Sequence, residues 1–109
     1  MDGYGLSATL EPEASDTVVI RLAGELDLAT REQVTEAVQA VLPVFRPDAL
    51  VLDLAAVTVL DSAGIGALVG CWKLAAGFGC TLRLCNPRPL AYAQLEITGL
   101  LDVFALPRN

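Results

Sequence analysis

The chain contains no histidine in its 109 residues. This absence excludes catalysis by Ser-His-Asp or Cys-His groups, phosphotransfer through histidine, and zinc sites with histidine ligands. Basic residues are also few, because seven lysines and arginines face thirteen acidic residues and leave a net charge of −6. Nucleic acids and anionic membranes attract proteins through basic patches. We therefore expect this protein to bind neither nucleic acid nor a membrane.

Cysteine is scarce, and the chain lacks the patterns of a secreted or membrane protein. Its three cysteines, Cys71, Cys80 and Cys85, do not have the paired C-x-x-C spacing of zinc sites. We interpret them as small buried hydrophobic residues in a reducing compartment, with a thiolate metal site as the alternative. The N-terminus is acidic, and no apolar run reaches the ~20 residues of a spanning helix. The expected location is the cytoplasm, and no cofactor or metal is expected.

Hydrophobic residues make up 54% of the chain and charged residues 18%, which predicts one folded domain over residues 1–109. Alternating and β-branched runs predict strands, and apolar residues at helical spacing predict helices. The predicted order is strand 6–10, strand 17–23, helix 31–42, strand 49–54, a helix from 62 to 77 or 79, strand 81–84 and helix 87–98. Strands that alternate with helices after an opening hairpin indicate an α/β fold with a mixed sheet and right-handed crossovers.

Local signals set the predicted ends of the helices. Thr30 and Gln33 have the spacing of a capping box at the start of the first helix. Pro43 is expected to stop this helix, because proline cannot donate the backbone hydrogen bond that a helix interior needs. Asn86 is predicted to cap the last helix, with Pro87 in its first position.

The most informative segment is Leu60–Gly66, which lies between a predicted strand and a predicted helix. It places the Ser62 hydroxyl where the helix begins, beyond the carboxyl end of a parallel strand, where such sheets bind ligands and partners. One interpretation is that Ser62 is simply the N-cap. The other is that Asp61 is the cap and leaves the Ser62 hydroxyl exposed to an external kinase. A nucleophilic role is excluded, because the segment has neither a general base nor a G-x-S-x-G motif.

Other residues with two interpretations flank this serine. Asp27, in the loop after the second strand, is either a turn acid or a residue near Ser62 that orients its hydroxyl or contacts a partner. Ala63 is small, and Gly64 and Gly66 are either close-packing glycines or a thin surface that a partner can approach. A phosphate-binding loop is not indicated, because no Walker-type lysine follows the glycines.

Several motifs along the chain occur in the order of a known family. They are Ala23–Asp27, Val51–Leu54, Leu60–Gly66 followed by Trp72-Lys73, and the late Ile97–Leu100. Together they resemble STAS domains over nearly the whole chain, and most of all the bacterial anti-sigma factor antagonists. The resemblance implies a STAS-like mixed sheet and a stand-alone binding protein that is not an enzyme.

The resemblance also implies a role in partner switching. In this family the domain binds an anti-sigma factor, which is often also a serine kinase, and thereby frees a sigma factor. The kinase phosphorylates the position of Ser62, a phosphatase reverses the modification, and the position of Asp27 is associated with partner binding. A second hydroxyl residue often follows the serine, but here it is Ala63, so Ser62 is the sole acceptor in the motif. The expected partner-binding residues are Asp27, Asp61, Ser62, Ala63, Gly64 and Gly66.

Two other functions stay open from the sequence. A STAS domain can instead be a subunit of a lipid-transport or signalling assembly that is never phosphorylated, because a fold does not fix a function. A nucleotide-binding or hydrolysing domain is the third hypothesis, prompted by the glycines near the sheet edge, although its fingerprint motifs are absent. Nothing in the sequence demands more than a monomer.

Overall fold

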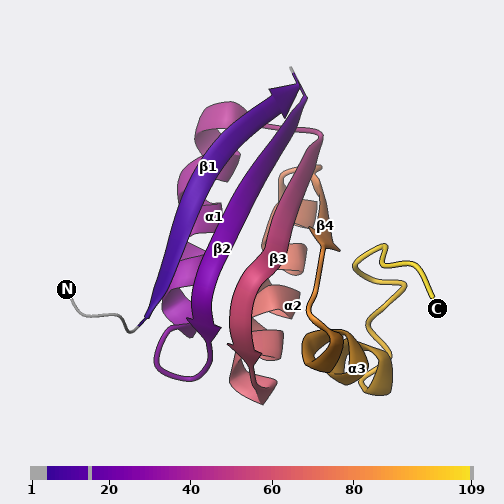
Figure 1. The fold of residues 1–109 in the computed structure, drawn as a ribbon. Helices are drawn as coiled ribbons and strands as arrows, with labels where there is room; N and C mark the ends of the chain where they lie inside the picture. Colours follow the sequence, from indigo (N-terminus) through magenta and orange to yellow (C-terminus); the bar gives the residue numbers. More distant parts are fainter. Residues whose placement is uncertain (1–4, 15, 109) are drawn as a thin grey trace.

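The computed structural model describes residues 5–14 and 16–108, which form a four-stranded sheet with three helices (Figure 1). The elements are β1 (Leu6–Ala14), β2 (Thr17–Leu26), α1 (Arg31–Phe45), β3 (Ala49–Leu60), α2 (Ser62–Gly77), β4 (Thr81–Cys85) and α3 (Pro89–Ile97). The strand order is β1-β2-β3-β4, in which β1 is antiparallel to β2 and the other two pairings are parallel. The predicted α/β fold, a mixed sheet opened by a hairpin, is confirmed.

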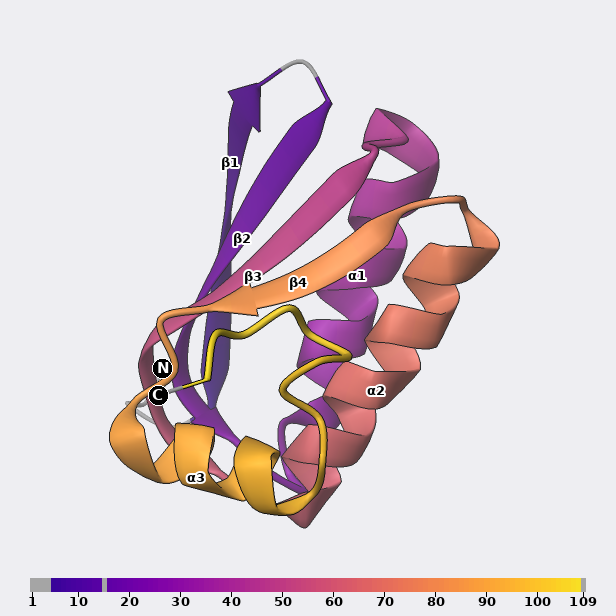
Figure 2. The same ribbon diagram turned by 90° about the vertical axis from the view of Figure 1, so that its right-hand side faces the viewer.

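The helices are arranged on one face and at one end of the sheet. α1 and α2 cover one face, and α3 lies across the end at which β3 finishes (Figure 2). Because side chains alternate along a strand, Ile20 and Leu22 of β2 are 1% exposed and join the core, whereas Arg21 between them is exposed. Leu68 of α2 and Leu95 of α3 belong to the same core. No helix in the described part of the chain has the length and apolar character needed to cross a membrane.

The strands are longer than the sequence predicted, because pairing between neighbours continues past the obvious apolar runs. β2 and β3 stay paired up to Leu26 and Leu60, with register shifts on the way, one of them just after Gly24. Gly24 has a φ of +117°, and a Cβ at this position would collide with the carbonyl oxygen of Gly5. Only glycine fits there, so Gly24 has the structural role of letting β2 bend while it continues.

The predicted end of the first helix is wrong, because α1 continues through Pro43 to Phe45. Pro43 lies in the last turn of α1 and has no N–H to donate. The helix therefore lacks only the hydrogen bond to the carbonyl of Gln39, and both residues are exposed. Arg46 then closes the helix with a left-handed φ of 45°, and its N–H donates to the carbonyl of Leu42 at 3.0 Å. The helix therefore ends on a left-handed residue and not on the proline.

The predicted start of the last helix is also wrong. α3 begins at Pro89, with Arg88 as its N-cap, and Asn86 lies outside the helix. Asn86 has a left-handed φ of 56°, and its side-chain amide donates to Asp53 Oδ1 on β3 at 3.3 Å. The Asn86 side chain, which local spacing predicted to cap the helix, therefore bonds to Asp53, a residue distant in the sequence.

The chain after α3 returns to the outer edge of the sheet. Leu101 and Phe104 are buried, and the carbonyl of Phe104 accepts a hydrogen bond from the N–H of Leu84 on β4 at 3.2 Å. The hydroxyl of Tyr92 on α3 donates to the carbonyl of Pro107 at 2.8 Å. These contacts fix the segment against β4 and α3.

Candidate functional site

The loops that carry Asp27 and Asp61 begin side by side. Leu26 of β2 is paired with Leu60 of β3, so each aspartate follows the last paired residue of its strand. The N–H of Asp61 donates to the carbonyl of Leu26 at 3.3 Å, which joins the two strand ends directly. The carboxyl ends of neighbouring parallel strands therefore bring the Asp27 loop to the start of α2, as the topology predicted.

Asp61, and not Ser62, is the N-cap of α2. Its backbone is extended, with φ −105° and ψ −176°, and its Oδ1 accepts a hydrogen bond from the N–H of Gly64 at 2.9 Å. Ser62 is the first residue of the helix and is exposed. No hydrogen bond between described residues uses its hydroxyl. Of the two interpretations of Ser62, the one in which Asp61 caps the helix is correct.

The two glycines of the segment have different environments. Gly64 is buried, and a Cβ there would collide with the carbonyl oxygen of Leu26, so this glycine lets α2 lie against the end of β2. A Cβ on Gly66 would meet no atom within 4 Å, and Gly66 is exposed. Ala63, between Ser62 and Gly64, is half-buried. The first turn of α2 thus presents a surface with small side chains around the Ser62 hydroxyl.

Asp27 folds back into its own loop. Its Oδ1 accepts hydrogen bonds from the N–H groups of Ala29 at 3.0 Å and Thr30 at 3.2 Å. No hydrogen bond between described residues joins this carboxylate to the Ser62 hydroxyl, as the interpretation that Asp27 orients the hydroxyl would require. The bonds use Oδ1 alone, so among the described residues Oδ2 has no hydrogen-bond donor. The next residue in this loop, Leu28, is 64% exposed.

Thr30 is the residue of this loop whose role the sequence did not predict. Its side chain makes no capping bond to α1, so the capping box is wrong. The buried hydroxyl instead donates to the carbonyl of Glu25 at 2.6 Å and accepts from the N–H of Asp27 at 3.0 Å. Gln33 is also used elsewhere, because its Oε1 accepts from the N–H of Leu6 at 3.1 Å. An acid followed three residues later by a threonine is typical of a turn held by side-chain hydrogen bonds. This pattern could have predicted the contact between Asp27 and Thr30.

The site is acidic and lacks a neutralising cation. The ion pairs between described residues are Arg21 with Glu11 at 3.1 Å and Arg108 with Asp102 at 3.3 Å, and neither involves Asp27 or Asp61. Within residues 5–14 and 16–108, no group of three cysteine, aspartate or glutamate side chains is placed to hold a metal ion. The chemistry that this arrangement offers is an exposed hydroxyl at the start of α2, with no metal-binding group of three side chains among the described residues.

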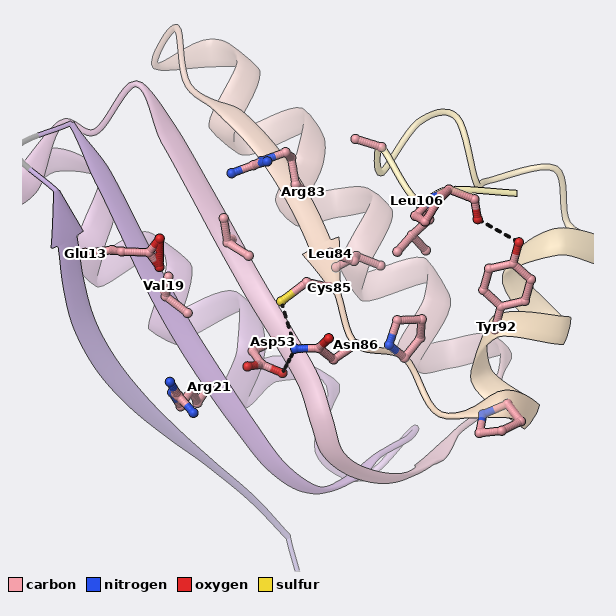
Figure 3. A pocket seen from close by; sticks show the side chains of 15 residues that line it. Glu13, Val19, Arg21, Asp53, Arg83, Leu84, Cys85, Asn86, Tyr92 and Leu106 are labelled. Carbon is pink, nitrogen blue, oxygen red and sulfur yellow. Dashed lines mark hydrogen bonds between the residues drawn. The ribbon is translucent and has the colours of Figure 1, made fainter. Parts of the chain in front are cut away.

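A hollow of about 840 Å³ lies elsewhere, on the sheet face without helices (Figure 3). Asp53, Arg83 and Cys85 line it, and none of the six predicted site residues does. Burial and the nearby Asp53 carboxylate raise the pKa of the Cys85 thiol. The half-buried Cys85 is thus protonated at neutral pH, and the hollow holds no thiolate nucleophile.

The other two cysteines are buried, as predicted. Burial raises the pKa of the Cys71 thiol from 9.0 to about 11, and burial also raises the pKa of Cys80. Both side chains belong to the hydrophobic core. They therefore pack as small apolar groups and stay protonated at neutral pH.

Comparison with known proteins identifies the family of this fold. Residues 10–109 match the family model of the STAS domain. The anti-sigma-B factor antagonist of Listeria monocytogenes serovar 1/2a is 32% identical over 101 residues, which cover 93% of this chain and 88% of that protein. The crystal structure of an anti-sigma factor antagonist from Mycobacterium paratuberculosis is similar with a TM-score of 0.80 and 28% identity, over 95% of this chain and 86% of that one.

A further solved structure is the Bacillus cell fate determinant SpoIIAA in its phosphorylated form. It is similar with a TM-score of 0.68 and 26% identity, over 88% of this chain and 86% of that chain. The resemblance to anti-sigma factor antagonists that the motifs indicated is confirmed. The chain belongs to the STAS domain family.

Proposed function

We propose that this protein is an anti-sigma factor antagonist that binds an anti-sigma factor, frees a sigma factor, and is switched off by phosphorylation of Ser62. The observation that carries the proposal is the position of Ser62, exposed on the first residue of α2 while Asp61 supplies the cap. Because the Ser62 hydroxyl does not cap α2, it can be phosphorylated without removing the hydrogen bond that begins the helix. Relatives named anti-sigma factor antagonists support the same role.

The proposed switch acts on binding and leaves the fold intact. A phosphoserine carries about −1.5 to −2 charges at neutral pH. At a helix N-terminus such a charge is favoured by about 0.3–1 kcal/mol, so α2 tolerates it. Buried against a partner that offers no cation, the same charge costs several kcal/mol. A penalty of about 3–4 kcal/mol corresponds to a several-hundred-fold loss of affinity, so the effect on the interface exceeds the effect on the fold.

The proposed docking surface is formed by the six predicted residues around the two strand ends. Ser62, Ala63 and Gly66 supply a surface that a partner backbone can approach closely, because their side chains are small or absent. Gly64 is buried beneath this surface and supports it, because the missing side chain lets α2 lie against Leu26. The remaining two residues are Asp27 and Asp61, whose carboxylates each use Oδ1 for a hydrogen bond within the protein. We propose their Oδ2 atoms as acceptors of hydrogen bonds from the partner.

The proposed partners follow from this switch. The anti-sigma factor is itself the serine kinase for Ser62, and a phosphatase restores the binding form. The protein acts as a cytoplasmic monomer, touches neither nucleic acid nor membrane, and performs no catalysis of its own. Its effect on transcription is indirect, because it changes how much sigma factor the anti-sigma factor holds.

Calorimetric titration with the cognate anti-sigma factor tests the proposal. Wild type and Ser62→Ala should bind alike, and Ser62→Asp should bind at least ~100-fold more weakly. Ser62→Asn is the matched control, because it has nearly the size of Ser62→Asp without the charge. Equal affinity of Ser62→Asp and wild type would refute the switch. Mass spectrometry after incubation with the kinase should find phosphate on Ser62, and an unmodified Ser62 would favour a STAS subunit that is never phosphorylated.

A further inference from the structure

β3 extends well beyond its neighbour β4. The last pair between these strands is Asp53 with Cys85, whereas β3 continues to Leu60 and is paired there with β2 alone. Figure 1 shows β3 running on toward α3 past the arrowhead of β4. The Nε of Arg88 donates to the carbonyl of Ala55 at 3.1 Å, where the next strand would otherwise bond. Beyond Ala55, no other described segment bonds to the backbone on this side of β3.

A groove of about 450 Å³ lies beside this free edge, between the end of β3 and the first half of α3. Val57 and Leu60 are buried along it, while Val59 is 41% exposed and Leu90 on α3 is 82% exposed. Residues 56–60 span about 13 Å at roughly 3.3 Å per residue, the length of a short added strand. An open row of backbone donors and acceptors beside an apolar groove is the arrangement that binds extended peptides by strand addition.

The groove is continuous with the proposed docking surface. Leu60 lines one end of the groove, and the next two residues, Asp61 and Ser62, begin α2. Ser62 itself lies in helical backbone, so an enzyme cannot bind it as part of an extended peptide. Any kinase of Ser62 must therefore recognise the folded surface around it, and the free edge of β3 ends at Leu60, two residues before Ser62.

We propose that an extended segment of the anti-sigma factor adds as a strand to β3 at residues 56–60 and packs apolar side chains against Val59 and Leu90. This inference rests on the proposed function, because it identifies how the same partner is held beside Ser62. Backbone hydrogen bonds supply affinity, and the exposed valine and leucine select apolar side chains at alternate positions of the added strand.

The test combines affinity measurements with hydrogen exchange on the complex of the full chain with its cognate anti-sigma factor. In Leu90→Lys we expect about tenfold weaker binding or more, because an apolar contact is replaced by a charge. Val44→Lys is the matched control, since Val44 is 74% exposed on the last turn of α1, at the other end of the molecule. It should bind as the wild type does. In the complex, the backbone amides of residues 56–60 should gain protection.

Each other outcome overturns the inference in a recognisable way. If Ser62→Asp weakens binding while Leu90→Lys does not and residues 56–60 gain no protection, the strand addition is wrong and the proposed function stands. If the wild type binds no anti-sigma factor, the proposed function fails and this inference fails with it. If residues 56–60 are protected in the isolated protein in proportion to its concentration, together with dimers in sedimentation, the occupant is a second copy of this chain.

Discussion

Gly64 of α2 lies directly against the carbonyl oxygen of Leu26, the last residue of β2. The contact leaves no room for a Cβ, so the first turn of the helix and the end of the strand meet backbone to backbone. The N–H of Asp61 adds a hydrogen bond to the same carbonyl at 3.3 Å. One peptide group of β2 thus sets the position of the helix that carries Ser62.

Gly64→Ala should therefore destabilise the protein by about 1–3 kcal/mol, because the new methyl group must displace backbone. Gly66→Ala is its control in the same helix, since open space surrounds that position. It should be neutral or stabilise the fold by up to about 1 kcal/mol, because alanine favours helix. Urea denaturation of both variants measures the difference. Equal stability of the two would show that the backbone contact at Gly64 is not tight.

Removal of the cap should separate the roles of two adjacent residues. Asp61→Ala loses the hydrogen bond from Gly64 and should cost about 0.5–2 kcal/mol of stability, while Asp61→Asn keeps an acceptor and should cost less. Ser62→Ala should change the unfolding free energy by less than about 0.5 kcal/mol, because its hydroxyl is exposed. Thermal and urea unfolding provide the numbers. If Ser62→Ala lowered the free energy of unfolding as much as Asp61→Ala does, Ser62 and not Asp61 would be the N-cap.

Thr30 should be a stability residue of the loop that precedes α1. Thr30→Val keeps the shape but removes the hydroxyl between Glu25 and Asp27, which leaves the part-buried carbonyl of Glu25 without its hydrogen bond from Thr30. We expect a loss of about 1–3 kcal/mol, and Thr30→Ser should recover most of it. Faster amide exchange at Asp27 in Thr30→Val would accompany the loss. Wild-type stability of Thr30→Val would contradict the hydrogen bonds described.

Stability should fall at alkaline pH because of Cys71. Its folded-state pKa of about 11 lies above the unfolded value of 9.0, so its contribution is fully present below pH 9 and is lost as the pH rises toward 11. The loss amounts to about 2–3 kcal/mol, from ~1.4 kcal/mol for each unit. Urea unfolding at several pH values should give wild type a steeper decline than Cys71→Ala over this range. Parallel curves for the two proteins would contradict this origin.

What the sequence predicted correctly depends on neighbours along the chain. The start of α2 was recognisable from spacing, which left open whether Asp61 or Ser62 is the cap, and the hydrogen bond from the N–H of Gly64 then decided for Asp61. The order of strands and helices along the chain likewise predicted the mixed sheet. These features need no information about distant residues.

Three of the errors occur where a partner distant in sequence changed the outcome. Asn86 was predicted to cap a helix, but its amide binds Asp53, which is 33 positions away in the chain. Gln33 had capping-box spacing, but it accepts from the N–H of Leu6 on β1. The length of β3 was underestimated because residues 55–60 are ordered by pairing with β2. Spacing in the sequence carries no signal for any of these three contacts.

The bond from Leu84 to Phe104 has a consequence for how the protein behaves at high concentration. The returning C-terminal segment occupies a place on the outer side of β4 where a strand from another molecule would have to bond. Sheets grow into fibres by adding strands at such unprotected sides, and proteins avoid this by covering them. Copies of this chain therefore cannot stack through this part of β4 unless the C-terminal segment first detaches.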